Sequence, residues 1–186
     1  MKLLRPLALA LWAAAPALAS GALPFDLGGA YRLTDQTGQP RTQADPDGRA
    51  QLLFFGYANC PGICTAALPL MADLTRALEA KDIAVTPVMI TVDPARDTVA
   101  SIGAPLHRIH PAFVGLTGDA AALKTAYAAF SVDHALAYED PEYGPVYSHG
   151  SLIYLMDAKG EVLTLFPPVL DTATATDIAL KYLSTP

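Results

Sequence analysis

The sequence FFGYANCPGIC, residues 54–64, decides the fold, because it joins a predicted buried strand to the start of a predicted helix. The strand is expected over residues 51–57, where QLLFFGY is nearly continuously apolar, as in sheets that helices cover on both faces. Helical spacing follows in four apolar residues: Leu70, Met71, Leu74 and Leu78. Pro69 has no N–H to donate, so we expect it to open or kink this helix and to leave Cys64 on a separate first turn.

Outward from this stretch, the pattern predicts further strands and helices along the chain. Strands are expected at 31–34, 83–92, 113–116, 151–156 and 162–166, the last two joined in a hairpin by a turn at 157–160. Helices are expected within 93–111, over 119–130 with Asp119 as N-cap, and over 171–183. Residues 131–144 are acidic and are predicted to be irregular. This order predicts an α/β chain with a thioredoxin-like fold, in which helices flank a central mixed sheet.

The first residues are typical of a secretory signal peptide. Lys2 and Arg5 precede an apolar run over residues 7–19, which ends in the small-x-small triplet of a cleavage site. A membrane anchor is the alternative, but the run is shorter than the roughly 20 residues that span a bilayer, and it contains Pro16. We therefore expect a signal peptide at 1–19, a flexible lead-in at 20–29 and the folded domain at 30–186. The protein is then exported to the bacterial periplasm without a stable membrane anchor, or is membrane-associated if the signal stays uncleaved.

Composition excludes two classes of protein. Of the 186 residues 52% are hydrophobic, which excludes a disordered chain, and the formal net charge of −6 argues against a nucleic-acid partner. Removal of residues 1–19 takes away two basic residues and no acidic one, so the net charge falls to −8, and it takes away Trp12, the only tryptophan. An exported chain meets an oxidising compartment, which bears on its two cysteines.

Cys60 and Cys64 form a C-x-x-x-C motif at the expected start of a helix. Unpaired N–H groups make that end of a helix electropositive and favour the thiolate form of a cysteine. Residues four apart on a helical turn share a face, so both sulfurs can point at one metal ion or at each other in a disulfide. An inert structural disulfide is the alternative, but closing so short a loop removes little entropy from the unfolded chain.

His149 lies just before the strand expected at 151–156, where a thioredoxin-like chain returns to the start of its helix. It can therefore face Cys60 and Cys64, although an ordinary loop position is the simpler interpretation of the histidine by itself. Two thiolates and one imidazole suit Cu(I), Cu(II) or zinc. The other histidines are interpreted as residues that bind no metal, the first two solvated in a loop: His107, His110 and His134.

The segment TVDPARDT, residues 91–98, follows the end of another predicted strand. Asp93, Arg96 and Asp97 can form an ion-paired network that fixes this loop behind the metal ligands. A plain structural turn is the interpretation that these residues favour by themselves.

These motifs together resemble the Sco/SenC family of copper-binding, thioredoxin-like assembly factors for cytochrome c oxidase. The resemblance runs from about residue 31 to residue 183. It rests on motifs in the family's order: FGY at 55–57 with CPxIC at 60–64, TVDPxRDT at 91–98, HPxF at 110–113 with GLTG at 115–118, His149, and YLxDxxG at 154–160.

The resemblance implies one copper ion per chain, as Cu(I) or Cu(II), with Cys60, Cys64 and His149 as its ligands. It also implies a role in building the dinuclear CuA centre of cytochrome c oxidase subunit II, which would be the partner. The chain departs from the family pattern near the ligands, with Gly62 in place of an acidic residue, Thr65 in place of a proline and Ser148 in place of an aspartate. The loss of acidic groups is expected to change copper affinity, redox potential and partner choice.

Three functions fit these residues. A copper metallochaperone, which is not an enzyme, would hold the ion and pass it on by exchanging ligands with a partner cysteine. A thiol–disulfide oxidoreductase would use Cys60 to attack a disulfide of the CuA cysteines and Cys64 to resolve the mixed disulfide. A copper or redox sensor would signal by its metal state, but the sequence has no output domain. We favour the metallochaperone.

Overall fold

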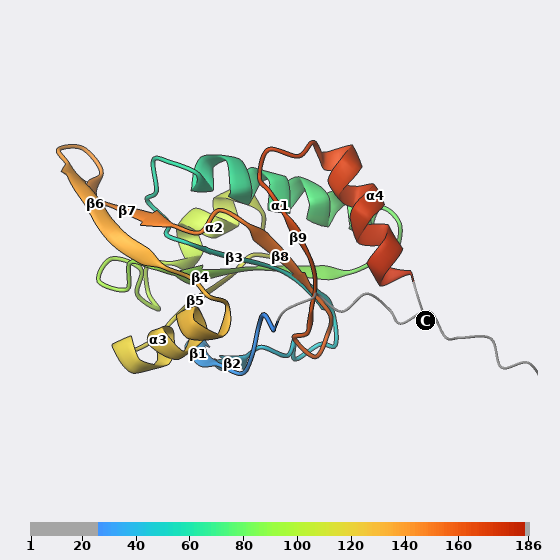
Figure 1. Ribbon diagram of the computed structural model, residues 1–186, viewed down its shortest axis with the longest axis horizontal. Coiled ribbons are helices and arrows are strands. Elements are labelled where there is room, and N and C mark those ends of the chain that lie inside the picture. The colour runs from blue at the N-terminus through green and yellow to red at the C-terminus, as the bar shows by residue number, and fades with distance from the viewer. Residues whose placement is uncertain (1–25, 185–186) are drawn as a thin grey trace, which may run out of the picture.

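A seven-stranded mixed sheet forms the centre of the computed structural model, which describes residues 26–184 (Figure 1). The strand order is β2-β1-β5-β4-β3-β8-β9. In chain order the bounds are β1 Arg32–Asp35, β2 Pro40–Thr42, β3 Ala50–Gly56, β4 Val85–Thr91, β5 Val114–Thr117, β8 Ile153–Met156 and β9 Val162–Phe166. β3 runs parallel to β4 and antiparallel to β8, and β8 runs antiparallel to β9. This arrangement is the thioredoxin-like fold that the sequence predicts. The short edge strand β2 is an addition that its polar sequence did not predict.

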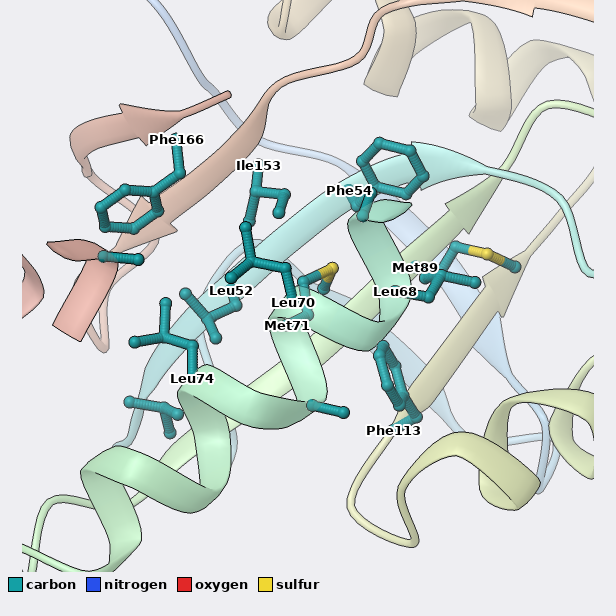
Figure 2. Packing of buried hydrophobic residues seen from close by; sticks show 14 of the residues in the cluster. Leu52, Phe54, Leu68, Leu70, Met71, Leu74, Met89, Phe113, Ile153 and Phe166 are labelled. Carbon is teal, nitrogen blue, oxygen red and sulfur yellow. The ribbon is translucent and has the colours of Figure 1, made fainter. Parts of the chain in front are cut away.

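Helices cover both faces of the sheet. They are α1 (Cys64–Glu79), α2 (Gly103–Ile109), α3 (Ala120–Ala129) and α4 (Thr172–Leu183). In Figure 1, α1 and α4 lie on one face of the sheet and α3 lies on the other. Alternate residues of β3 supply both cores: Leu52 and Phe54 pack with the side chains of α1, as Figure 2 shows, whereas Leu53 and Phe55 pack in the cluster that contains α3. Burial on both faces explains why the sequence of β3 is almost continuously apolar.

Two parallel strands carry the chain to one edge of the sheet. β3 and β4 are in register from Ala50↔Val85 to Gly56↔Thr91, so both end at the same edge. The loop with the cysteines follows β3, and the loop with Asp93, Arg96 and Asp97 follows β4. Segments that are far apart in sequence therefore meet beside the start of α1.

Helix α1 is continuous from Cys64 and contains Pro69, so the prediction that Pro69 opens the helix and leaves Cys64 on a separate first turn was wrong. The missing N–H of Pro69 deprives the carbonyl oxygen of Thr65, four residues earlier, of its helical donor. Thr65 and Pro69 are both exposed, so water can reach that carbonyl group. The buried face of the helix, with Met71 and Leu74, stays intact and holds Cys64 as part of one rigid element.

Residues 131–144 are not irregular as predicted, because β6 (His134–Asp140) pairs antiparallel with β7 (Gly144–His149). No residue of β6 is buried, so the strand lacks the alternation of apolar and polar residues that would have revealed it. The backbone hydrogen bonds to β7 stabilise the strand instead. Figure 1 shows this hairpin projecting from the body of the protein, and its second strand ends at His149.

The predicted signal peptide, residues 1–19, lies outside the described residues, as does most of the lead-in. Residues 26–29 have no regular secondary structure. Among the helices of residues 26–184, none has the length and hydropathy that crossing a membrane requires.

Candidate metal centre

Three candidate ligands meet where β3 ends, α1 begins and β7 ends. Nε2 of His149 lies 3.6 Å from Sγ of Cys64 and 4.0 Å from Sγ of Cys60, and the three atoms all lie within 4.8 Å of one another. Both cysteines are free thiols. Donors about 2.0–2.3 Å from one metal ion at trigonal angles are roughly 3.8 Å apart. One ion therefore fits among these atoms with small adjustments.

The two thiols differ in exposure and in charge. Cys64 is 3% exposed, whereas Cys60 is half-buried at the rim of the site. A hydrogen bond from the Cys64 thiol lowers the pKa of Cys60 to about 4 against the effect of burial, and nearby backbone N–H groups act in the same direction. The same hydrogen bond, with burial, raises the pKa of Cys64. Cys60 is therefore the sulfur of the pair that ionises first.

The start of α1 adds positive potential at the sulfurs. Its N-cap residue, Ile63, makes no side-chain capping bond, and no acidic residue lies in the first turn. The positive end of the helix dipole is consequently not neutralised by a local carboxylate. This environment favours thiolates and a bound anionic metal–thiolate group.

The imidazole of His149 is oriented by one hydrogen bond and two aromatic rings. Its Nδ1 lies 2.9 Å from the carbonyl oxygen of Gly150, which can only accept, so Nδ1 carries the proton and the lone pair of Nε2 is free to face the sulfurs. The rings of Phe54 and Tyr57 stand edge-on to the imidazole, with centroids at 5.7 and 5.8 Å. The hydroxyl of Tyr57 accepts a hydrogen bond from the N–H of Tyr147, on the same strand as His149. The imidazole of this candidate ligand is thus held in a fixed tautomer and plane.

Arg96 ties the hairpin to the two loops at this edge of the sheet. Its Nη1 and Nη2 donate to the carbonyl oxygens of Tyr143 and Pro145, at 2.5 and 2.6 Å. Its Nε pairs with the carboxylate of Asp93, and its guanidinium carbon lies 5.5 Å from the centre of the Tyr57 ring. The Asp93–Arg96 ion pair, which the sequence allowed although it favoured a plain turn, is present, and the reach of Arg96 to the hairpin is a contact that the sequence did not predict.

Asp97 acts on the cysteine loop through hydrogen bonds. One oxygen of its buried carboxylate accepts from the N–H of Ala58, at 3.0 Å, and from the hydroxyl of Thr91, at 2.8 Å. Burial raises the pKa of Asp97 and outweighs these hydrogen bonds and the charge of Arg96, which lower it. Asp97 therefore fixes the start of the loop that leads to Cys60, at a cost in desolvation.

We expect Asp97→Asn and Asp97→Ala to affect stability differently. The alanine variant leaves the Ala58 N–H and Thr91 hydroxyl without an acceptor, a loss of about 1–3 kcal/mol in the free energy of unfolding. The asparagine variant keeps an acceptor and removes a charge whose folded-state pKa is raised. Such a carboxylate destabilises the fold while it is ionised. The free energy of unfolding of Asp97→Asn, relative to that of wild type, should therefore be highest near neutral pH. This difference should fall as the pH drops through the pKa of Asp97, because the wild-type carboxyl group then becomes neutral. Urea denaturation between pH 4 and 7 measures both effects, and equal losses in the two variants would contradict this role.

The three departures from the family pattern have visible local consequences. A Cβ atom at Gly62 would meet only Sγ of Cys60, at 3.9 Å, so an acidic side chain would fit there and glycine leaves the site less negative. The hydroxyl of Thr65 donates to the carbonyl oxygen of Gly62, at 2.7 Å, and closes the turn before α1. The hydroxyl of Ser148 donates to the carbonyl oxygen of Ala135, across the hairpin.

The structure does not bring the other histidines to the site as ligands. Among residues 26–184 the only group of three side chains spaced to hold a metal ion is Cys60, Cys64 and His149. His107 lies in α2 rather than in a loop, and its Nε2 is 3.1 Å from the carbonyl oxygen of Phe113. The prediction that His110 is solvated was wrong, because His110 is 8% exposed and its Nδ1 accepts from the N–H of Ala112.

Comparison with known proteins identifies the family. The chain matches the family model described as SCO1/SenC over residues 20–184. An SCO2-like protein of Rickettsia conorii is 36% identical over 143 residues, which cover 75% of this chain and 69% of that protein. ScoI of Arabidopsis thaliana with copper bound has a TM-score of 0.78 at 27% identity, covering 85% of this chain and 98% of that one. ScoI of Bradyrhizobium japonicum with copper bound has a TM-score of 0.74 at 31% identity, covering 84% and 99%. The chain belongs to the SCO1/SenC family.

Proposed function

We propose that this protein binds one copper ion through Sγ of Cys60, Sγ of Cys64 and Nε2 of His149, and that it delivers the ion to a partner. The observation that carries the proposal is the convergence of these three atoms within 4.8 Å, although His149 is 85 residues from Cys64. Two thiolates and one imidazole hold Cu(I) and also accommodate Cu(II). The copper bound in ScoI of two other organisms supports copper over zinc.

The difference in exposure between the cysteines suggests how the ion leaves. Cys60 lies at the rim, whereas Cys64 is buried in the first turn of α1. A partner thiolate would therefore replace Cys60 first, forming one copper–sulfur bond as another breaks, and would replace the remaining ligands afterwards. The copper keeps its oxidation state throughout, so this transfer needs no electron donor.

We further propose that delivery serves the CuA centre of cytochrome c oxidase subunit II, outside the cytoplasmic membrane. The Sco family is described as one of cytochrome c oxidase assembly proteins, which supports the first part. The family match begins at residue 20, directly after the expected cleavage site, which supports export by residues 1–19.

Anaerobic titration of the reduced protein with copper tests binding. With a chromophoric Cu(I) chelator as competitor, the protein should withhold one equivalent of Cu(I) per chain. A separate titration with Cu(II) should produce thiolate-to-copper absorption that saturates at one equivalent. Failure to compete for Cu(I) while both thiols are reduced would contradict the proposal.

A thiol–disulfide oxidoreductase is the second candidate, and the unequal thiols favour it. The Cys60 thiolate would attack a partner disulfide and release one partner thiolate. Cys64, after losing its proton, would attack Sγ of Cys60 and release the second, leaving a Cys60–Cys64 disulfide. The partner disulfide gains two electrons, and a thiol reductant must return two electrons to the protein.

Limited alkylation should modify Cys60 well before Cys64. Because Cys60 is both more exposed and the thiolate, a short pulse of iodoacetamide should react with it at least about tenfold faster. Peptide mass mapping measures the ratio, and the denatured protein, in which both thiols react alike, is the control. Faster modification of Cys64 would contradict the assigned order of attack in both candidate functions.

The two functions separate when the CuA domain of subunit II is the substrate. Two equivalents of the Cu(I)-loaded protein, mixed with the reduced, copper-free domain and then treated with a one-electron oxidant, should generate the CuA spectrum if delivery is the function. Copper-free, reduced protein mixed with the oxidised domain should release two thiols per domain if reduction is the function. Release of thiols in the second mixture, without a CuA spectrum in the first, would replace the delivery proposal by the reductase.

A further inference from the structure

The hairpin of β6 and β7 presents an uncovered surface beside the candidate metal centre. Its strands pair only with each other among the described residues, and β6 has no buried side chain. Three large hydrophobic side chains lie exposed on it: Leu136 at 54%, Tyr138 at 55% and Tyr143 at 44%. The ladder pairs Leu136 with Tyr147 and Tyr138 with Val146, so Leu136 and Tyr138 lie on opposite faces of the hairpin, and Tyr143 lies in the turn that joins the two strands.

The same hairpin is uniformly acidic. Asp133, Glu139, Asp140 and Glu142 lie on or beside it, and the sequence contains no lysine or arginine between Lys124 and Lys159. The guanidinium group of Arg96 contacts the hairpin, and the carboxylate of Asp93 balances its charge. The hairpin as a whole therefore carries a net negative charge.

The hairpin and the exposed thiol share one hollow. A depression of about 470 Å³ is lined by Ala58, Asn59, Cys60, Glu142 and Tyr143. A partner that brings a sulfur atom to Cys60 through this hollow must contact the side chains of Glu142 and Tyr143. The acidic and aromatic groups are therefore part of the approach to the reactive atom, rather than a distant patch.

We propose that this hairpin face is the docking surface for a partner protein whose reactive cysteine lies within a basic rim. The proposal rests on the proposed function, because ligand exchange and thiol exchange both require a partner sulfur at Cys60. Exposed charges of opposite sign mainly accelerate encounter and make it sensitive to salt. The exposed side chain of Tyr143, which lines the hollow, supplies an apolar contact that becomes buried in the complex.

A charge-matched pair of peptides tests this surface without copper. Each peptide carries one cysteine as its mixed disulfide with thionitrobenzoate, and the two differ only in lysine against glutamate at the flanking positions. The Cys60 thiolate attacks the peptide sulfur and releases the coloured thionitrobenzoate, so absorbance reports the rate of approach. The reduced wild-type protein should react about tenfold faster with the lysine peptide at low salt, and the preference should largely vanish in 0.5 M NaCl.

Two double variants show whether the charge preference comes from the hairpin. Glu139→Gln/Glu142→Gln should remove most of the preference, whereas Glu79→Gln/Asp82→Asn should retain it. The control changes net charge equally, but Glu79 is the last residue of α1, which puts it roughly 22 Å along the helix from Cys64. All four side chains are exposed, so neither double variant removes a buried contact.

An absent preference in wild type, or equal losses in the two double variants, would overturn the docking surface. Neither result would affect the copper titration, so a failed docking surface and a failed copper site give different observations. Conversely, a charge preference that depends on the hairpin would stand even if the protein bound no copper.

Discussion

Replacing His149 by alanine is expected to weaken copper binding by at least about 100-fold. Loss of a group one step removed from a metal already costs roughly 10–100-fold in affinity, and His149 is proposed as a direct ligand. Its imidazole is exposed enough, as a half-buried residue on the projecting hairpin, for the fold to survive the substitution. Competition with a Cu(I) chelator measures the affinity. Cu(II) spectra should lose their single well-defined thiolate-to-copper band.

His134→Ala is the matched control for this experiment. His134 is the residue directly opposite His149 in the ladder of β6 and β7, and it is exposed, but it is not among the three converging ligands. Its substitution should leave copper affinity within about twofold of wild type. Equal losses in the two variants would mean that the hairpin as a whole matters, rather than the Nε2 atom of His149. Thiol exchange should continue in both variants, because both cysteines are present.

Replacing Arg96 by alanine is expected to weaken copper binding by roughly 10–100-fold without removing a ligand. Arg96 joins Asp93 to two carbonyl groups at the start of β7, and that strand ends at His149. Without the guanidinium group, the hairpin loses its anchor and the imidazole spends less time facing the sulfurs. The electron paramagnetic resonance spectrum of the Cu(II) form should broaden, while the alkylation rate of Cys60 should change little.

Two further variants separate positioning from charge and from general stability. Arg96→Lys keeps the positive charge but lacks the planar fork that serves two carbonyl oxygens at once, so it should restore only part of the affinity. Arg76→Ala removes an exposed arginine that pairs with Asp73 on α1, and it should leave copper binding unchanged. Wild-type affinity and an unchanged spectrum in Arg96→Ala would contradict the positioning role.

The sheet and most helices were predictable because their patterns are local. β3 is buried on both faces, so its sequence is continuously apolar, and Asp119 and Asp171 each cap a helix with a carboxylate oxygen, at positions where the sequence indicates a helix start. The sequence did not predict the hairpin strand β6 because none of its residues is buried, and burial of one face is what produces a regular spacing of apolar residues. The sequence did not predict that α1 continues through Pro69, because this depends on whether water reaches the carbonyl group of Thr65. The sequence does not show that exposure.

The candidate site was predictable in its residue types but not in its supports. The spacing of Cys60 and Cys64 is local, and the resemblance to a family supplied His149. The contacts of Arg96 with Tyr143 and Pro145 join residues that are 47 and 49 positions apart, so no short pattern carries them. The edge-on packing of Tyr57 against His149 likewise depends on the pairing of the hairpin.

X-ray absorption at the copper edge of the protein loaded with one equivalent of Cu(I) tests the central claim most directly. This measurement counts the sulfur and nitrogen neighbours of the ion without reference to any partner. We expect two sulfur ligands and one imidazole nitrogen in wild type, and two sulfur ligands without the imidazole in His149→Ala. A first shell in wild type with no imidazole, or with fewer than two sulfurs, would contradict the assignment of Cys60, Cys64 and His149 as the copper site.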